Sequence, residues 1–381
     1  MKKTDVLIIG AGVNGCSIAY NLVKKGFDVT VVEKDYVASG ASGRNGGGIR
    51  QQWSTEDNIR LAMESVKIFE RLDEELNYET EYTQGGYLVI AHTEEEVKQF
   101  KRNVALQRKL GLPVEYLDAS EINEIVPQLN VEGIGALGAT WCPTDGHADP
   151  IKVTLAYYLA AKRLGAKIIK HTKVIGFKKG KDNRITSVLT DKGEIETKYV
   201  VNSAGAYSAE VAKLAGVSLP NKPYRHEILI TEPVKRFFTP MIISFHDNVY
   251  FRQTLDGNII GGWGDPEEKP GFKLESTKKF LYKMAWLLSR YMPILKNVRV
   301  LRQWAGLYDV TPDARPILGP SEGVENLIQV NGFSGHGFMV SPMTAKIISQ
   351  YIAGEKTVIS LENLGMSRFK GKILKERSVV G

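Results

Sequence analysis

The sequence is poor in cysteine and contains no long hydrophobic run. Its 381 residues include only Cys16 and Cys142, too few for a disulfide framework, and neither a CxxC pair nor a histidine cluster is present to bind a metal. No window approaches the roughly 18 consecutive apolar residues of a membrane-spanning helix, and no cleavable signal precedes the first apolar strand. We therefore expect a cytoplasmic protein with no metal and no integral membrane segment.

Neither sign of charge dominates the chain. Fifty Lys and Arg stand against 43 Asp and Glu, a net charge of +7, and only residues 167–184 and 368–377 are basic stretches. Because neither stretch interleaves aromatic residues at useful spacing, we expect solvated surface there and no nucleic-acid partner. A hydrophobic content of 43% is that of an ordinary folded protein, here long enough for roughly two to three domains.

The first 33 residues have the pattern of a strand, a glycine turn, a helix and a second strand. A strand over residues 6–9 precedes Gly10, Gly12 and Gly15, a helix is predicted over residues 13–25, and a strand over residues 29–32 ends at Glu33. This spacing is typical of a dinucleotide site, with the pyrophosphate at the helix N-terminus and the acid on a ribose. A carboxylate there disfavours NADP and leaves NAD and FAD open.

The segment after Glu33 favours FAD. It reads "KDYVASGASGRNGGGIRQQW", a polar glycine-rich loop placed where a second phosphate and a flavin would lie. A nicotinamide enzyme would normally show another strand or helix here. A later strand, residues 199–202, ends on the small residues Ser203, Ala204 and Gly205, which again allow close approach of a ligand.

The remaining pattern predicts an α/β fold. Helices are expected over residues 55–76, 94–110, 119–126, 150–164 and 206–215, with strands near residues 87–90 and 166–170. Strand and helix segments of the kind that begins the chain recur later in the sequence, separated by segments of another kind. We therefore predict a discontinuous Rossmann-like FAD-binding domain (residues 1–88, 147–219 and 305–381) with an inserted sheet-rich substrate domain (residues 89–146 and 220–304).

Four motifs together resemble those of a known family. They are "VLIIGAGVNGCSIAYNL", "VVNSAGAYS", "WAGLYDVTPDARPILGP" and "NGFSGHGFMVSPMTAKIISQYI", and they look like the FAD-dependent amine and amino-acid oxidoreductases of the D-amino acid oxidase superfamily, in the sarcosine oxidase and glycine oxidase branch. The "GGGIRQQW" and "GFSGHGFM" segments are similar to the β subunit of archaeal dye-linked L-proline dehydrogenases. The resemblance covers nearly the whole chain.

The resemblance implies FAD-binding residues in several parts of the chain. For the ADP half they are Gly10, Ala11, Gly12, Val13, Asn14, Gly15, Glu33 and Lys34, with Val174 on the adenine side and Ala204 and Gly205 against the dinucleotide. For the pyrophosphate, ribityl chain and flavin edge they are Ser42, Gly43, Arg44, Asn45, Gly46 and Gly47. Around the flavin they are Gly306, Gly332, Phe333, Ser334, Gly335, His336, Gly337, Phe338 and Met339.

The resemblance also implies a substrate site. Arg50 matches the arginine that holds the substrate carboxylate in sarcosine oxidases, a role that suits a guanidinium fork. Tyr308 matches a tyrosine of that site. Phe251 and Trp263 fall where it has ring side chains, although core packing explains them equally well. His226 is a candidate base by residue type, with a structural strand histidine as the alternative.

Two departures from the family pattern bear on the chemistry. Gly306 stands where monomeric sarcosine oxidases carry the cysteine that links to the flavin, and "SGASGR" lacks the linking histidine of dimethylglycine dehydrogenases, so FAD is expected to be non-covalent. Met339 replaces the lysine that activates oxygen in sarcosine oxidases. A neutral thioether cannot supply that charge, which favours a dehydrogenase.

The resemblance thus implies an FAD-dependent dehydrogenase of CH–NH donors that oxidises L-proline to 1-pyrroline-5-carboxylate by hydride transfer to flavin N5. Relatives of this type are hetero-oligomers with a second flavin subunit, which allows an FMN at an interface and a loose membrane association through partners. Two alternatives stay open. One is an O2-using oxidase of sarcosine, glycine or a D-amino acid, and the other is an FAD-carrying electron-transfer subunit without its own substrate site.

Overall fold

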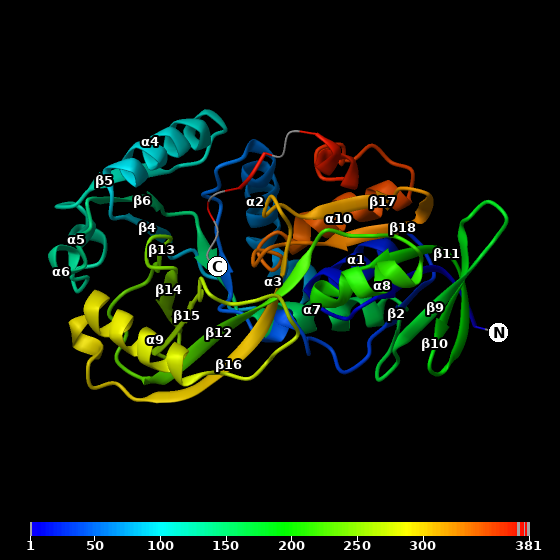
Figure 1. Ribbon diagram of the computed structural model, residues 1–381, viewed down its shortest axis with the longest axis horizontal. Coiled ribbons are helices and arrows are strands. Elements are labelled where there is room, and N and C mark those ends of the chain that lie inside the picture. The colour runs from blue at the N-terminus through cyan, green and yellow to red at the C-terminus, as the bar shows by residue number, and fades with distance from the viewer. Residues whose placement is uncertain (1, 372–373, 377, 379–381) are drawn as a thin grey trace.

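The computed structural model describes residues 2–371, 374–376 and 378, and most of its strands form two large sheets (Figure 1). The first has the order β17-β18-β11-β1-β2-β8, with β10 and β9 continuing beside β11. Its strands are β1 (Lys2–Ile9), β2 (Val29–Val32), β8 (Lys167–Ile169), β9 (Val174–Lys179), β10 (Ile185–Thr190), β11 (Gly193–Asn202), β17 (Ile317–Ser321) and β18 (Val324–Asn331). The run from β18 to β8 is parallel, as expected for an α/β fold.

Both faces of the first sheet are covered. On one face the side chains of Val6 and Ile8 join a core with α1 (Val13–Lys24), α7 (Pro150–Arg163) and α10 (Ser341–Ile352). On the other, Leu7 and Ile9 pack with β9, β10 and α8 (Ser208–Leu214). Helix α1 ends where Gly26 adopts a φ of +85°. The glycine turn therefore follows the carboxyl end of β1, whose last four residues, 6–9, are all buried.

The second sheet has the order β16-β12-β15-β14-β13-β4-β6-β5. Its strands are β4 (Tyr87–Ala91), β5 (Glu115–Asp118), β6 (Gly138–Cys142), β12 (Lys222–Pro233), β13 (Met241–Ser244), β14 (Val249–Gln253), β15 (Asn258–Trp263) and β16 (Val300–Val310). Leu88 and Ile90 face the core beneath α9 (Lys278–Tyr291), whereas Val89 and Ala91 face the opposite side, where they meet α4 (Glu94–Lys109). The two faces of this sheet therefore carry alternate residues of each strand.

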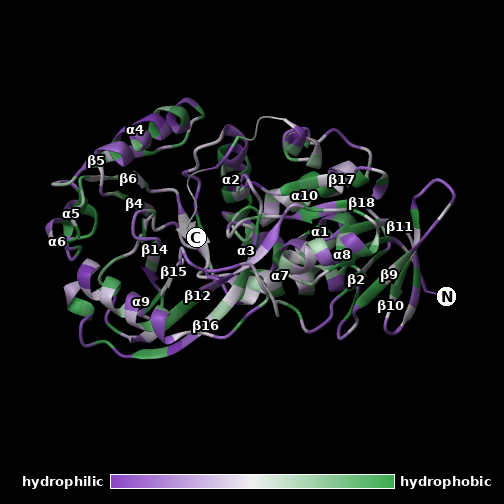
Figure 2. Cartoon of the chain, viewed as in Figure 1, coloured by the Kyte–Doolittle hydropathy of each residue, from purple (hydrophilic) through white to green (hydrophobic). Residues whose placement is uncertain are grey.

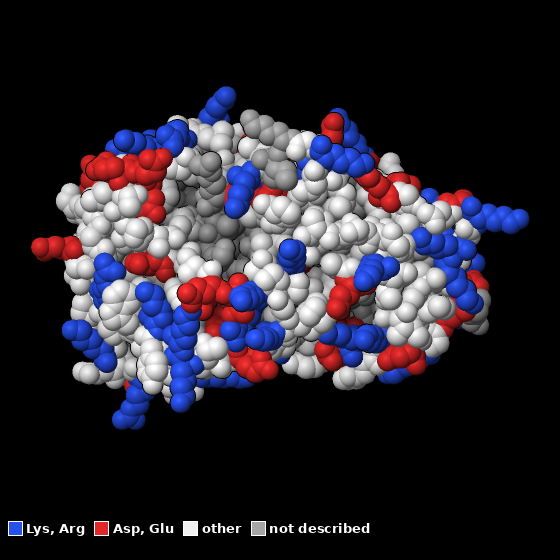
Figure 3. All heavy atoms as spheres, viewed as in Figure 1, with Lys and Arg blue, Asp and Glu red and all other residues white. Residues whose placement is uncertain are grey.

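Shorter elements complete the described part of the chain. They are η1 (Ala41–Gly43), β3 (Gly48–Ile49), β7 (Gly146–His147), α5 (Ile122–Ile125), α6 (Val131–Ile134), η2 (Gly205–Tyr207), η3 (Pro293–Leu295) and η4 (Met366–Lys370). Strands β3 and β7 pair with each other antiparallel. Helix α4 is mostly hydrophilic outside its few buried residues (Figure 2), and basic and acidic side chains are intermixed over the face shown in Figure 3.

The architecture confirms the predicted α/β fold, and some predicted elements differ in extent. The helix expected over residues 55–76 is two helices, α2 (Glu56–Phe69) and α3 (Leu72–Leu76), because the chain turns at Glu70 and Arg71. The helix expected over residues 119–126 is only the single turn of α5. All of β4 lies in the second sheet, so that sheet begins ahead of the domain boundary predicted at residue 88.

Candidate active site

The turn between β1 and α1 is shaped by its glycines. Gly10 has a φ of +104°, and a Cβ added there would lie 2.6 Å from the Ser203 carbonyl oxygen. A Cβ on Gly15 would lie 1.9 Å from the Gly10 carbonyl oxygen, and one on Gly12 would lie 2.9 Å from Ser42 Oγ. The backbone of this turn therefore lies very close to Ser203, which follows the neighbouring strand β11, and to the loop at Ser42. No side chain fits at these glycines.

Glu33 lies beside this turn at the end of β2. Its side chain is buried, Oε2 accepts a hydrogen bond from the Ala11 amide at 2.8 Å, and Oε1 accepts one from the Asp35 amide at 2.8 Å. Lys34 follows with its Nζ 3.3 Å from the centre of the Tyr207 ring. The acidic side chain thus has the fixed position that the fingerprint predicts for a ribose ligand.

The polar loop after Glu33 packs onto the start of α1. The Val13 amide donates to Ser42 Oγ at 2.9 Å, and Asn45 Oδ1 accepts from the Gly47 amide at 2.9 Å. Arg44 is fixed by carbonyl oxygens, with Nε donating to Ser39 and Nη1 to Ala305, both at 3.0 Å. The loop therefore connects the glycine turn to β16, where a Cβ on Gly306 would lie 3.3 Å from the Arg44 Cβ.

The final glycine loop joins the same region from the other end of the chain. Asn14 Nδ2 donates to the Gly337 carbonyl at 3.3 Å, and the buried Asp309 accepts from the Gly332 amide at 2.6 Å. Gly335 has a φ of +93°, and an added Cβ would lie 2.6 Å from the Tyr308 ring. Burial raises the pKa of Asp309 to about 7, although hydrogen bonds from Asn221 and Gly332 oppose the shift.

Three residues predicted to contact FAD lie at the edges of this arrangement. Val174 is buried in a cluster with Val32 below the end of β2. The Cα of Ala204 lies 3.3 Å from a Cβ built on Gly10, and Gly205 follows with a φ of +55°. Residues predicted to bind FAD thus come from seven separate stretches of the chain, and the contacts above join 10–15 with 33–34, 42–47, 204–205 and 332–339, and 42–47 with 306.

A pocket opens between the two sheets beside the glycine loops. Its walls come from the second sheet, from both loops and from the segment that begins at β3, and they include Gly46, Gly47, Gly48, Arg50, Trp53, Tyr87, Met241, Ile243, Tyr250, Tyr308, Ser334, Gly335, His336, Phe338 and Met339. On the second sheet the lining residues of β4, β13 and β14 lie on the face opposite α9. The pocket thus combines one buried cation, three phenols and a largely apolar wall.

Arg50 is the buried cation of this pocket. It is 4% exposed, and its guanidinium carbon lies 4.0 Å from the centre of the Trp53 ring. Nη1 donates to the Gln52 carbonyl at 3.0 Å and Nη2 to the Ser378 carbonyl. Within residues 2–371, 374–376 and 378, no carboxylate forms an ion pair with it. Burial lowers its pKa, so an anionic ligand would relieve a real electrostatic cost.

The chain as a whole is similar to known proteins. A family model described as FAD dependent oxidoreductase matches residues 5–351. The chain belongs to this family. It is 29% identical over 374 residues to the sarcosine oxidase subunit beta of Arthrobacter sp, covering 97% of this chain and 92% of that protein.

Solved structures agree with the family assignment. An L-proline dehydrogenase from P. horikoshii has a TM-score of 0.91 at 39% identity, covering 97% of this chain and 98% of that one. A glycine oxidase from Geobacillus kaustophilus has a TM-score of 0.89 at 23% identity, covering 97% and 99%, and shows the shared fold. This FAD-dependent oxidoreductase thus belongs with enzymes of amine and amino-acid substrates.

The described residues of this oxidoreductase fit an FAD. Besides the glycine turn that no side chain can fill, buried polar atoms without a partner face this region: Asn14 Oδ1 and both ring nitrogens of His336. The His336 ring lies 4.6 Å from that of Trp53, and burial lowers its pKa to about 4. A neutral imidazole with free nitrogens suits hydrogen bonding to a polar heterocycle.

Two residues predicted for the substrate site lie elsewhere. Phe251 is completely buried beneath α9, 5.9 Å from the ring of Tyr291. Trp263 belongs to the same core. The pocket is instead lined by Tyr250, the neighbour of Phe251 on the opposite face of β14. The prediction missed Tyr250 and Tyr87, and the strict alternation of a strand is the signal that could have found them.

The predicted candidate base, His226, is not a lining residue of the pocket. Its ring stacks on Tyr308 with centres 4.4 Å apart and on Tyr250 at 5.6 Å. Burial lowers its pKa to about 4 and raises the pKa values of both tyrosines, so all three rings are neutral near pH 7.

The described residues contain neither a membrane-spanning helix nor a metal-binding cluster. None of the helices within residues 2–371, 374–376 and 378 is long and apolar enough to cross a membrane. In the same part of the chain no group of three or more His, Cys, Asp or Glu side chains is arranged to hold a metal ion.

Proposed function

We propose that this chain is a dehydrogenase of a small secondary amino acid, L-proline in the first place, with 1-pyrroline-5-carboxylate as the product. The observation that carries the proposal is Arg50, a buried cation without a carboxylate partner among the described residues, in a pocket that also contains the final glycine loop. A guanidinium in that state suits the carboxylate of an amino acid. The similarity to an L-proline dehydrogenase at 39% identity supports this choice of substrate.

The pocket residues would orient the substrate. Arg50 would bind the carboxylate, and the Tyr308 and Tyr250 phenols, neutral at pH 7, would donate or accept hydrogen bonds beside it. Met241 and Ile243 offer an apolar wall to a pyrrolidine ring. FAD, when bound, supplies the acceptor for the hydride. Because these side chains exclude water and fix the ring, the protein's contribution is chiefly orientation.

The amine must lose its proton before it can donate a hydride. His226 does not serve as its base in this proposal, since Tyr308 and Tyr250 stack on its ring and it is absent from the pocket lining. Asp145 is buried behind the pocket and is held by Gln51 and Gln52. The substrate would therefore bind as the neutral amine or release its proton to solvent.

We assign the activity to a dehydrogenase because of Met339. Its thioether lines the pocket where oxidases of the resembled branch carry a lysine, and a thioether provides no positive charge for oxygen reduction. Electrons would then pass to a partner. The relative from Arthrobacter sp carries the name of a subunit, which supports a hetero-oligomer.

A second cavity supports the proposal of a second flavin at a subunit interface. It touches Gly43 and Asn45 of the polar loop and is lined by the buried Arg252 and His147. Arg252 uses Nε to reach the Gly46 carbonyl at 2.8 Å. Since a buried arginine beside the cofactor loop suits a phosphate, an FMN could bind here with a partner completing the site.

Anaerobic bleaching of the purified yellow protein tests the function. L-proline, sarcosine, glycine and D-alanine are added separately, and air is admitted afterwards. Bleaching by L-proline with slow recovery in air is expected. Bleaching by sarcosine or D-alanine with immediate recovery would establish an oxidase instead, and no bleaching by any of the four would favour an electron-carrying subunit.

A further inference from the structure

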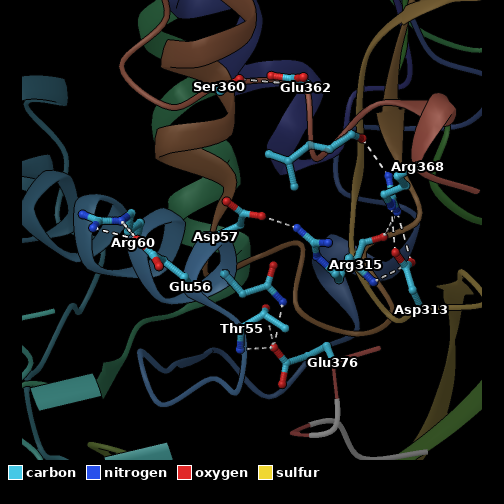
Figure 4. A network of polar contacts seen from close by, with 12 residues as sticks. Thr55, Glu56, Asp57, Arg60, Asp313, Arg315, Ser360, Glu362, Arg368 and Glu376 are labelled. Atoms are coloured by element: carbon cyan, nitrogen blue, oxygen red, sulfur yellow. Dashed lines mark hydrogen bonds and ion pairs between the residues drawn. The ribbon is translucent and has the colours of Figure 1, made fainter. Parts of the chain in front are cut away.

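The C-terminal residues Glu376 and Ser378 lie against the segment that carries Arg50. Glu376 is completely buried, and Ser54, Thr55 and Asn58, which donate to its carboxylate, lie 318 or more positions away in sequence. Its carboxylate accepts hydrogen bonds from the Ser54 amide at 3.0 Å and from Asn58 Nδ2 at 3.2 Å. It also accepts one from the Thr55 amide at 3.1 Å (Figure 4). The hydroxyls of Ser54 and Thr55 donate to it as well.

These contacts make Glu376 the cap of helix α2. The helix begins at Glu56, and Thr55 at the N-cap position makes no side-chain capping bond of its own. A carboxylate at this end satisfies free amides and interacts favourably with the helix dipole. Burial alone would raise the pKa of Glu376, but the hydrogen bonds from Ser54, Ser378 and Thr55 outweigh it and keep the pKa below its ordinary value.

The chain leading to Glu376 is tied down at Asp313. Arg368 binds the Asp313 carboxylate through Nε at 2.7 Å and Nη2 at 3.1 Å, with both side chains buried. The Glu376 amide then donates to the Asp313 carbonyl at 2.9 Å. Arg315 pairs with Asp57 between these two anchors (Figure 4). The position of Glu376 is therefore fixed from both sides.

Beyond Glu376 the chain reaches the substrate-site arginine. The Ser378 carbonyl accepts from Arg50 Nη2, the Gln52 carbonyl accepts from Nη1, and the guanidinium stacks on Trp53. A guanidinium has five N–H donors, so two carbonyls fix its plane and leave donors for a ligand. The cap at Glu376 and the carbonyl at Ser378 thus act on the same short segment, residues 50–55.

We propose that Glu376 and Ser378 belong to the substrate site, and that Glu376 is a positioning residue that holds the Arg50 guanidinium in the orientation that receives the substrate carboxylate. This inference rests on the proposed function insofar as Arg50 binds a carboxylate. It adds Glu376 and Ser378 to the substrate site, and neither residue belongs to the glycine motifs or to the lining of the pocket.

The test compares Glu376→Gln with the parent in the FAD-loaded chain. The probe is tetrahydrofuran-2-carboxylate, which has the ring and carboxylate of proline but no amine to oxidise, and its Kd is followed by the flavin absorbance shift. Loss of a hydrogen bond to a charged group weakens binding by roughly tenfold. We expect the Kd for the probe and the KM for L-proline to rise about tenfold, with kcat within twofold.

Amide hydrogen exchange provides a readout that does not depend on activity. The amides of Ser54 and Thr55 should exchange faster in Glu376→Gln, because their acceptor is weakened. Glu362→Gln is the matched control, an exposed carboxylate in the same C-terminal region, and should change nothing. If Glu376→Gln does not fold, a chain ending at residue 371 replaces it in the test. This shorter chain keeps the Arg368–Asp313 pair but lacks Glu376 and Ser378.

The outcomes separate this inference from the proposed function. If the parent is bleached by L-proline and both variants bind the probe as the parent does, the positioning role is overturned while the function stands. Tighter probe binding in the variants would mean that the tail competes with the substrate, which also overturns it. If the parent neither binds the probe nor is bleached, both proposals fail together.

Discussion

The ring of His226 lies parallel to that of Tyr308, with 7° between their planes and 4.4 Å between their centres. Tyr250 stacks on the same imidazole at 5.6 Å, so one histidine on β12 supports two phenols of the pocket. Gly262 allows this arrangement, since a Cβ there would meet both Tyr250 and His226 within 2.8 Å. The arrangement makes the stability of the pocket depend on the charge of a single buried ring.

Replacing His226 should change how stability depends on pH. Burial lowers its pKa from 6.5 to about 4, so its contribution is complete above pH 6.5 and is lost as the pH falls towards 4. His226→Phe keeps a stacked ring that cannot titrate. In denaturant titrations between pH 7 and pH 4.5, we expect the free energy of unfolding of His226→Phe to fall by about 2 kcal/mol less than that of the parent. His171→Asn, at an exposed histidine, is the control, and equal slopes in parent and His226→Phe would contradict the prediction.

Removing the Arg50 guanidinium should affect substrate binding without loss of FAD. Truncating one partner of a buried charge pair costs about 3 kcal/mol, which corresponds to a rise of roughly a hundredfold in the KM for L-proline. Arg50→Ala is compared with Arg60→Ala, an exposed arginine of α2 paired with Glu56. Steady-state kinetics and the flavin spectrum check the prediction, and unchanged kinetics would remove Arg50 from the site.

Oxygen reactivity should respond to charge at position 339. Met339→Lys places an ammonium in the pocket and is expected to speed reoxidation of the reduced protein by air at least tenfold, about 1.4 kcal/mol of barrier. Met339→Leu removes the sulfur without adding charge and should behave like the parent. Stopped-flow mixing with aerated buffer measures both. Equal rates in all three proteins would remove the explanation given for dehydrogenase behaviour.

The glycine turn should not tolerate even one methyl group. In Gly15→Ala the new Cβ would lie 1.9 Å from the Gly10 carbonyl oxygen, so the backbone must move where the dinucleotide is expected. We expect the purified variant to be colourless, with a lower melting temperature than the parent. Gly271→Ala, where nothing lies within 4 Å, is the control. A yellow Gly15→Ala protein with normal FAD content would contradict this role of the turn.

Local sequence patterns predicted the glycine turn and Glu33 well, because each depends on a few neighbouring residues. The strand at residues 29–32 and the helices near residues 94–110 and 150–164 were predicted almost to their ends, since caps such as Asp149 and the capping box of Thr93 mark them. The domain boundaries and the cofactor roles stay predictions.

The substrate pocket was harder to predict from local patterns. Phe251 was chosen in place of Tyr250, and a shift of one position in a strand moves a side chain to the other face of the sheet. The role of Glu376 depends on contacts more than 300 positions away in sequence, for which neither periodicity nor a motif gives a signal. Only the folded chain shows that Glu376, which caps α2, comes from near the C-terminus of the protein.

The alternation of the chain between the two sheets has a consequence for unfolding. Strands β1 and β2 belong to the first sheet, β4 to β6 to the second, β8 to β11 to the first, β12 to β16 to the second, and β17 and β18 to the first. Neither sheet is therefore a contiguous stretch that could be excised and folded alone. Each sheet is complete only when segments distant in sequence have paired. We therefore expect slow folding, and a single cooperative unfolding transition that includes both sheets.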